Sequence, residues 1–432
     1  MRKGQVIGVC IITMGCAKNE VDSADMASRL LAAGYRMLDA PEEADAIIVN
    51  TCSFIQAATE ESIEAIFEAA GLPRVRAGRT ELVVAGCMPA RYGEDLADSL
   101  EEVKTFVPCG KEDDIVAVLD GLFPGRVRAQ GEPGMVSQGP SAYVKISDGC
   151  DRFCSYCTIP FIRGRYHSFS FEQIEADVAR AVESGAREIV LIAQDSGRWG
   201  QDLEEGRALA WLLGALAQRH PRTWLRVMYL QPEGVTDRLL ECLRSHDNVC
   251  SYLDIPFQHC NERILRSMNR KGTRESYLRL VEHVREAVPG ITLRTTLIAG
   301  FPGETEADFE ELCDFIEDID FDYVGVFPYS REEGTRAAGL PDQIDQDSKE
   351  ERAQQVRELA DSLSQARIAN RIGQDMDILV LGEEADGQLF GRAQCQAPDV
   401  DGLTYLDRGG IGAVQRVRIG ATLFYEMEGE AL

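Results

Sequence analysis

Residues 141–165 read SAYVKISDGCDRFCSYCTIPFIRGR, and this stretch holds the pattern that decides the fold. Tyr143–Ser147 predicts a strand, and Cys150, Cys154 and Cys157 follow it in the spacing Cys-x3-Cys-x2-Cys. A structural zinc ion needs four closed ligands, and His167, ten residues further on, is a poor fourth ligand. Three thiolates suit a [4Fe–4S] cluster that keeps one iron open, with zinc as the alternative.

The same stretch begins a series of strands that alternate with helices, which predicts an α/β fold with a parallel sheet. Helical patterns follow at residues 171–184, 208–219 and 277–287. Six strand–helix units are fewer than the eight of a closed barrel, so residues 142–347 predict an open, partial (β/α) barrel. An open iron at the carboxyl ends of barrel strands would be catalytic rather than structural. The six expected strands are residues 143–147, 188–193, 224–230, 249–255, 291–298 and 323–327.

Residues 1–130 repeat one pattern three times: a short run rich in Val and Ile, and then a cysteine, at Cys16, Cys52 and Cys87. Such runs are typical of strands buried on both faces of a parallel sheet, and helices are expected at 20–33 and 59–70. Ligands bind at the carboxyl ends of such strands, so the three thiols are expected at one edge, where they could share a site. The alternative is three small buried thiols. The first cysteine also ends a stretch that resembles a lipoprotein signal, but the recurrence of the pattern favours a strand.

A linker is expected at residues 131–141, which are rich in Gly, Pro and Ser, and the chain ends in a different kind of domain. A charged connecting helix is expected over 348–367. Residues 368–432 predict a small antiparallel β-barrel with strands near 378–381, 389–394 and 413–419.

Composition excludes several classes of protein. The 432 residues carry a formal charge of −27, which argues against non-specific binding to nucleic acid or to an acidic membrane. No apolar run approaches the roughly 20 residues that span a bilayer. Thirteen cysteines in a chain of this size favour thiolate ligands in a reducing compartment, so a cytoplasmic location is expected.

The Cys-x3-Cys-x2-Cys motif resembles that of the radical S-adenosylmethionine enzymes, and GCDRFCSYCTIPFIRGR is similar to the methylthiotransferases among them. The resemblance covers essentially the whole chain. It implies that Cys16, Cys52 and Cys87 bind a second [4Fe–4S] cluster, and that the carboxy-terminal barrel is a TRAM domain. One segment departs from the family, which often has Ser-Arg-Pro where this chain reads His167-Ser-Phe-Ser170.

The resemblance also implies the chemistry. Cys150, Cys154 and Cys157 would hold the cluster that binds and cleaves S-adenosylmethionine, giving a 5′-deoxyadenosyl radical that takes hydrogen from an unactivated carbon. The second cluster would carry the sulfur that is methylated and transferred. The enzyme would then need a sulfur donor and a reductant such as flavodoxin or ferredoxin.

Other positions are expected to contact S-adenosylmethionine, with an ordinary core or loop position as the alternative for each. Tyr156 would pack on the adenine, and Gln194 and Asp195 would hold the methionine amino group. Gln258 and Arg294 would meet the ribose or the carboxylate. Residues 300–305 resemble a loop that lines the cofactor site, and His259 is expected to be structural. The thiols outside the two triads are expected in the core or at the surface: Cys10, Cys109, Cys242, Cys250, Cys260, Cys313 and Cys395.

Two substrates are known in the family: an aspartate side chain of a small-subunit ribosomal protein, and an adenosine beside the tRNA anticodon. Stretches such as 15–23, 229–234 and 325–335 resemble the ribosomal-protein type, and the tRNA type more often has Gly-Gln-Asn where this chain has Ala-Gln-Asp at 193–195. Residues 368–432 hold five arginines, no lysine and eleven acidic residues, which suits a basic protein substrate better than tRNA. We therefore expect methylthiolation at the β-carbon of the aspartate, with the tRNA enzyme as the alternative. Other radical chemistry and a non-enzymatic iron–sulfur scaffold are further alternatives.

One basic segment interrupts this acidic chain. Five cations lie within twelve residues, and we interpret them as a solvated helix face, with a docking site for an acidic electron donor as the alternative: Arg263, Arg266, Arg270, Lys271 and Arg274.

Overall fold

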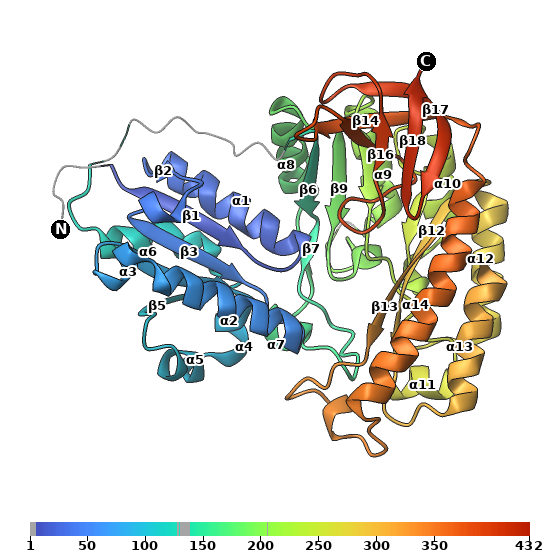
Figure 1. The fold of residues 1–432 in the computed structure, drawn as a ribbon, viewed down its shortest axis with the longest axis horizontal. Helices are drawn as coiled ribbons and strands as arrows, with labels where there is room; N and C mark the ends of the chain where they lie inside the picture. The colour runs from blue at the N-terminus through green and yellow to red at the C-terminus, as the bar shows by residue number, and fades with distance from the viewer. Residues whose placement is uncertain (1–5, 128, 130–138, 205) are drawn as a thin grey trace. The chain divides into compact units, whose positions relative to one another are not determined.

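The computed structural model describes residues 6–127, 129, 139–204 and 206–432 (Figure 1). The described chain forms two compact units. The first holds the residues up to 129 together with 148–151 and 157–166, and the second holds 139–147, 152–156 and the residues from 167 onward. Most of the predicted linker lies outside the described residues, and its last residue, Ser141, already begins a strand.

The first unit is built on a five-stranded parallel sheet in the order β2-β1-β3-β4-β5. Its central strand β3 is buried along its whole length, as its Val and Ile content predicts. The three expected strands are confirmed, and β2 and β5 are additional. The strands are β1 (Gly8–Thr13), β2 (Arg36–Met37), β3 (Ala46–Thr51), β4 (Glu81–Gly86) and β5 (Thr105–Pro108).

Helices cover both faces of this sheet. One face packs against α2 through Ala65 and Ile66, and the other against α1 and α6 through Leu30 and Leu119. The two expected helices are confirmed, each starting three residues earlier than predicted. The helices are α1 (Ala17–Ala32), α2 (Gln56–Gly71), α3 (Pro73–Arg76), α4 (Cys87–Tyr92), α5 (Glu94–Ser99) and α6 (Ile115–Leu122).

The second unit contains the partial barrel, and all six expected strands are present. They form two three-stranded parallel sheets, β10-β9-β6 and β11-β12-β13, and a parallel bridge between Leu225 and Val249 links the two. The strands are β6 (Ser141–Lys145), β9 (Glu188–Ile192), β10 (Trp224–Val227), β11 (Tyr252–Asp254), β12 (Thr292–Ala299) and β13 (Tyr323–Pro328). Two-residue strands flank the cysteine motif in the sequence: β7 (Ser147–Asp148) and β8 (His167–Ser168).

Helices alternate with the barrel strands, and their starts follow local sequence. Thr273 and Thr305 each begin a helix with a capping box, in which the threonine side chain and the residue three positions later bond each other's backbone N–H groups. The helices of this part are α7 (Ile159–Ile162), α8 (Phe171–Glu183), α9 (Leu209–Arg219), α10 (Asp237–Ser245), α11 (Glu262–Ser267), α12 (Arg274–Ala287), α13 (Glu306–Ile319) and α14 (Gln346–Ala369). No helix of the described residues is both long and apolar enough to cross a membrane.

The chain ends in the expected small barrel, which we call the tail barrel (residues 375–431). It is closed in the order β14-β15-β16-β18-β17, and one pair, β16 with β18, runs parallel where an all-antiparallel barrel was expected. The strands are β14 (Asp375–Glu383), β15 (Leu389–Ala393), β16 (Thr404–Leu406), β17 (Val414–Leu423) and β18 (Glu426–Ala431).

The tail barrel is fixed to the partial barrel by buried charges. Glu188, the first residue of β9, accepts from Arg226 of β10 at 2.9 Å and from Arg392 of β15 at 2.5 Å. Tyr252, the first residue of β11, donates to Asp401 at 2.6 Å. Because these contacts involve residues near the beginnings of their strands, the tail barrel lies at the amino-terminal ends of the barrel strands.

Replacing Glu188 with glutamine should destabilise this junction, because it leaves two buried guanidinium groups without their counter-charge. Loss of one partner of a buried ion pair costs about 3–5 kcal/mol, so the midpoint of urea unfolding should fall clearly. Burial alone would raise the pKa of Glu188, but the charges of Arg226 and Arg392 outweigh burial and hold the pKa below its ordinary value. The ionised Glu188 therefore stabilises the folded chain fully at a pH above its unfolded-state pKa. This stabilisation is lost as the pH falls through the lower pKa that Glu188 has in the folded state.

Urea unfolding, followed by circular dichroism, measures the loss of stability at pH 7. Repeating it at lower pH measures how the stabilisation by Glu188 depends on pH. The matched control is Glu241→Gln, which removes an exposed carboxylate paired with Arg244 and should leave the midpoint where it is. An unfolding midpoint that is unchanged in Glu188→Gln would contradict the assigned role of the junction.

Candidate active site

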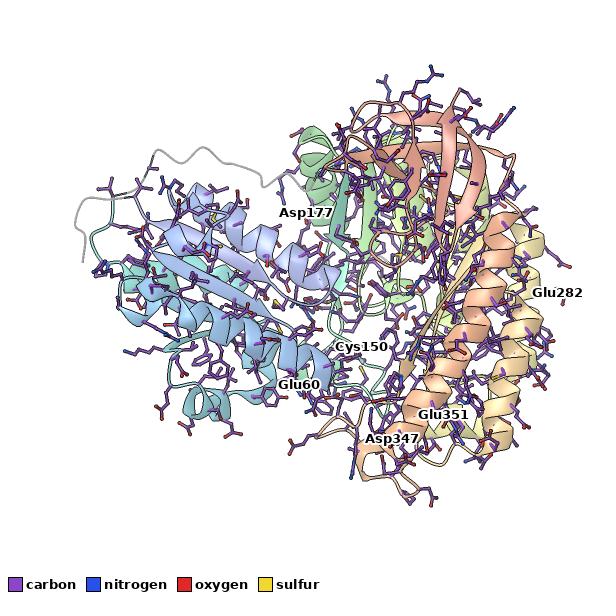
Figure 2. The ribbon with its side chains drawn as sticks, viewed as in Figure 1. Glu60, Cys150, Asp177, Glu282, Asp347 and Glu351 are labelled. Atoms are coloured by element: carbon purple, nitrogen blue, oxygen red, sulfur yellow. The ribbon has the colours of Figure 1, made fainter. Side chains whose placement is uncertain are left out.

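The Cys-x3-Cys-x2-Cys loop follows the first barrel strand (Figure 2). Cys150 is buried, and its backbone N–H donates to the carbonyl of Gly164 at 3.1 Å. Gly149 has a φ of +74°, and a Cβ there would collide with the carbonyl of Arg165. Only glycine therefore fits directly before the first cysteine. Cys154 and Cys157 are partly exposed.

The segment around Cys154 is held by the loop after α11. Ser155 donates from its backbone N–H to Met268 O at 2.9 Å and from its hydroxyl to Ser267 O at 2.7 Å. The Asn269 side chain donates to the carbonyls of Arg152 and Phe153 at 3.1 and 3.0 Å. Four hydrogen-bonding groups of this short loop thus have fixed partners. The position of Cys154 is therefore set by contacts with residues more than a hundred positions away in the sequence.

Arg152, inside the motif, connects this loop to the end of β9. Its Nε donates to Asp195 Oδ2 at 2.6 Å, and its Nη1 to Glu233 at 3.0 Å. Asp195 is completely buried, and burial raises its pKa although the charge of Arg152 opposes the shift. Among the described residues, neither Asp195 Oδ1 nor the buried Oε1 of Gln194 has a hydrogen-bond partner. Two unsatisfied acceptors at one strand end suit a donor such as an ammonium group.

A cavity of about 350 Å³ opens beside Cys154. Its lining combines one thiol, three cationic side chains, one carboxylate and one amide: Cys154, Arg152, Arg270, Lys271, Glu233 and Asn269. The cavity lies on the side of the barrel where β9 and β10 end. A charged ligand, rather than an apolar one, fits a wall of this composition.

The structure brings the three amino-terminal cysteines to one edge of their sheet. Cys16 follows β1 and precedes α1, Cys52 follows β3, and Cys87 follows β4 as the first residue of α4. Burial raises the pKa of Cys52 to about 11, and the neighbouring Cys16 and Cys87 thiols add to the rise. Gly15 has a φ of +92° and a Cβ there would meet the Cys52 side chain, so the end of β1 lies directly against it.

A fourth thiol lies at this edge, and sequence reasoning missed it. Cys109 directly follows β5, and the register pairs Gly86 with Pro108, so Cys87 and Cys109 are neighbours. The Cys109 thiol also donates to Ile162 O at 3.3 Å. Cys109 follows a strand like the other three cysteines, but β5 has only four residues, too few for its pattern to predict a strand from the sequence.

Arg163, in the FIRGR part of the motif stretch, is a second residue that sequence reasoning missed. Its side chain is buried and donates to Asp22 at 2.8 Å, to Asp148 at 3.1 Å and to Cys87 Sγ at 3.7 Å. The hydrogen bond from Cys109 and the charge of Arg163 lower the pKa of Cys87 to about 7 against the effect of burial. Thiolate is the form that binds metal, so this environment favours ligation.

The donor chemistry of the two triads suits iron–sulfur clusters, because each triad offers three thiols and proteins hold such clusters by cysteine thiolates. Each triad also has an arginine beside one of its thiols, Arg163 at Cys87 and Arg270 at Cys154, which suits a bound group with a net negative charge.

The other expected cofactor residues have these places. Tyr156 packs against the barrel core. Gln258 has a φ of +71°, and its backbone bridges to β12 through Thr296 and Ile298. Arg294 is the third residue of β12 and pairs with Asp254 at 3.0 Å. Its guanidinium also lies 3.5 Å from Asp401 of the tail barrel, near the amino-terminal end of the strand. The roles expected for these residues stay predictions.

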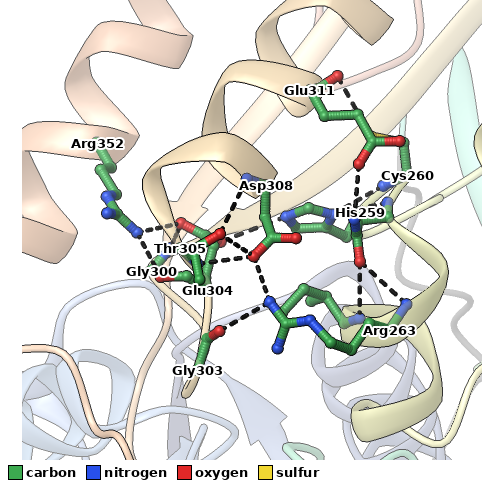
Figure 3. A network of polar contacts seen from close by, with 12 residues as sticks. His259, Cys260, Arg263, Gly300, Gly303, Glu304, Thr305, Asp308, Glu311 and Arg352 are labelled. Carbon is green, nitrogen blue, oxygen red and sulfur yellow. Dashed lines mark hydrogen bonds and ion pairs between the residues drawn. The ribbon is translucent and has the colours of Figure 1, made fainter.

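Residues 300–305 and His259 form a buried polar network (Figure 3). Both carboxylate oxygens of Glu304 accept from Gly300 N at 3.0 Å, and Arg352 donates to the same carboxylate at 2.9 Å. His259 Nδ1 accepts two backbone N–H bonds at 3.0 Å, which leaves Nε2 facing Glu304 at 3.4 Å. Every one of these contacts holds a loop in place, so the structural interpretation of His259 is supported.

Three family models match consecutive parts of the chain. Residues 8–108 match uncharacterised protein family UPF0004, residues 144–316 the radical SAM superfamily, and residues 372–432 the TRAM domain. Curated relatives are named ribosomal protein uS12 methylthiotransferase RimO. That of Geobacter sulfurreducens is 41% identical over 98% of each chain, and that of Clostridioides difficile is 38% identical over 99% of each chain.

Solved structures share the fold. The radical S-adenosylmethionine methyltransferase TsrM from Kitasatospora setae, with cobalamin and a [4Fe–4S] cluster bound, is 15% identical, covering 76% of this chain and 74% of its own, with a TM-score of 0.57. The cobalamin-dependent enzyme OxsB, with S-adenosylmethionine bound, gives a TM-score of 0.53 at 12% identity, covering 83% of this chain and 56% of its own.

Proposed function

This chain belongs to the RimO family of ribosomal protein uS12 methylthiotransferases within the radical SAM superfamily, and on that premise we propose that it methylthiolates the β-carbon of an aspartate in uS12. It is an enzyme of the radical SAM methylthiotransferase kind, whose cofactor classes are an iron–sulfur cluster and S-adenosylmethionine.

We assign Cys150, Cys154 and Cys157 as the ligands of a [4Fe–4S] cluster with one open iron. When bound, this cluster and S-adenosylmethionine supply a 5′-deoxyadenosyl radical that can remove hydrogen from an unactivated carbon. Around it, the chain's own residues bind and orient. Arg152 holds the loop to the end of β9. We assign Gln194 and Asp195 to accept from the ammonium group of S-adenosylmethionine, and their unsatisfied buried oxygens support this assignment.

We assign Cys16, Cys52 and Cys87 as the ligands of a second [4Fe–4S] cluster, which would hold the sulfur that is transferred. One observation supports the two-cluster proposal most strongly: three strands of one parallel sheet are each followed within three residues by a cysteine, and the thiols of Cys16 and Cys87 both raise the pKa of Cys52. A buried arginine and a hydrogen-bonding thiol beside Cys87 favour its thiolate form. Sulfide and a reductant such as flavodoxin or ferredoxin would come from outside the chain.

The tail barrel favours a protein substrate over tRNA. Arg371 and Arg392 are buried against Asp322 and Glu188, where they face the partial barrel. The three remaining arginines of residues 368–432 pair within the tail itself: Arg408, Arg416 and Arg418. Each arginine of this segment therefore has a partner, whereas phosphate binding needs a basic surface. An acidic surface would instead steer a basic ribosomal protein.

Mass spectrometry tests the substrate. The anaerobically reconstituted protein, with S-adenosylmethionine, sulfide and a reductant, should add a methylthio group to an aspartate-containing peptide of uS12. Unfractionated tRNA under the same conditions should stay unmodified. A methylthio group on a tRNA adenosine would establish the alternative substrate, and modification of neither would contradict the proposed function.

A further inference from the structure

Arg270 has no carboxylate partner, although it belongs to a segment of paired arginines. Arg263 pairs with Asp308, Arg266 with Glu262, and Arg274 with Asp318. Among the described residues, Arg270 makes no ion pair, and its Nε is shielded from solvent without any hydrogen-bond partner. Its Nη2 donates to the carbonyl of Pro256 at 2.6 Å, which fixes the guanidinium.

The groups that face Arg270 identify what would compensate its charge. Its guanidinium lies near the Cys154 thiol and the phenols of Tyr156 and Tyr277. The pKa of Arg270 is raised, because these groups outweigh the lowering effect of burial. Arg270 and Cys154 also line the same cavity. A shielded charge is costly without a counter-charge. The carboxylate of this cavity, Glu233, is paired with Arg152, and the Cys154 thiol becomes an anion when it binds a metal as a thiolate.

We propose that Arg270 sets the reduction potential of the cluster held by Cys154, through an N–H···S hydrogen bond and its positive charge. This inference rests on the proposed assignment of Cys150, Cys154 and Cys157. A cluster that accepts one electron becomes more negative by one charge. A fixed cation at a ligating sulfur stabilises the reduced form more than the oxidised form and so raises the potential. Arg270 would thus be a tuning residue that makes reduction by a weak cellular reductant feasible.

Potentiometric titration tests this in the full-length chain. The Cys16→Ala/Cys52→Ala/Cys87→Ala background leaves one cluster, and electron paramagnetic resonance reports its reduced form. In Arg270→Gln the ratio of reduced to oxidised cluster at a given potential should fall about tenfold, which is about 59 mV for one electron. Arg270→Lys keeps the charge and should retain most of the ratio. The matched control is Lys271→Gln, which removes an exposed cation from the same cavity and should shift the ratio much less, because water screens it.

Each outcome decides for or against the proposal. Equal potentials in Arg270→Gln and Lys271→Gln would overturn it, as would equal shifts in Arg270→Gln and Arg270→Lys. Arg270→Gln could fold, as judged by circular dichroism, and still bind no iron. In that case, iron binding in Arg270→Lys would support a need for the positive charge, and loss of iron from both variants would overturn the tuning role. If the potential shifts in this background while the chain with all its cysteines modifies tRNA and not uS12, the proposed substrate is refuted and this inference stands.

Discussion

Replacing Cys154 with alanine should reduce the cleavage of S-adenosylmethionine to the rate without protein. Cys154 is one of only three thiolates expected to hold the cluster, and its loop is fixed by Ser155 and Asn269. With two ligands left, the open iron has no stable position from which to bind the amino and carboxylate groups of S-adenosylmethionine. Formation of 5′-deoxyadenosine under anaerobic, reducing conditions, followed by liquid chromatography and mass spectrometry, measures the effect.

The control for this variant is Cys313→Ala. Cys313 is a partly exposed thiol on α13, outside both triads, and its replacement should leave the formation of 5′-deoxyadenosine unchanged. A Cys154→Ala protein that cleaves S-adenosylmethionine at the normal rate would show that this loop does not hold the radical-generating cluster.

Replacing Cys52 with alanine should separate the two halves of the reaction. Cleavage of S-adenosylmethionine should continue without methylthiolation, because the radical site keeps its three ligands while the sulfur-carrying site loses one. Iron should fall from about eight to about four per chain, as expected for the loss of one of two four-iron clusters. Iron analysis, 5′-deoxyadenosine and the methylthiolated uS12 peptide are measured on the same sample.

The matched control lies in the same sheet. Cys10 is a buried thiol in the middle of β1, and it donates to Asp39 O, so Cys10→Ala should keep both the iron and the product. A Cys52→Ala protein with full iron and full product would refute the second cluster at Cys16, Cys52 and Cys87. Loss of both activities together would show that one site depends on the other.

Sequence reasoning succeeded where local pattern determines structure. Val- and Ile-rich runs predicted six barrel strands and three strands of the amino-terminal sheet, and the rule that parallel strands end at one edge predicted that Cys16, Cys52 and Cys87 gather there. It missed β5, which has only four residues, and with it the neighbouring thiol of Cys109. It also missed β18, where acidic residues alternate with Met and Gly.

The residues that support the cysteines could not be found in this way, because their partners are distant in the sequence. Arg163 donates to Cys87, which lies 76 positions away in the sequence, and the side chain of Asn269 donates to Arg152, which lies 117 positions away. The basic segment illustrates the same limit. A solvated face is correct for Arg266, whose side chain is 74% exposed, and wrong for Arg270, whose Nε is shielded and whose Nη2 is bound to a backbone carbonyl.

The position of the tail barrel determines how far a bound substrate must extend to contact both the tail barrel and the motif loop. It is joined to the beginnings of the barrel strands, whereas Asp195 and the motif loop follow strand ends. The longest of these strands, β12, has eight residues, a length of roughly 26 Å at the usual rise. A substrate that contacts the tail barrel while one of its side chains reaches the motif loop would therefore have to extend along the side of the partial barrel. We expect an isolated short peptide to make one of these two contacts and a longer polypeptide to make both.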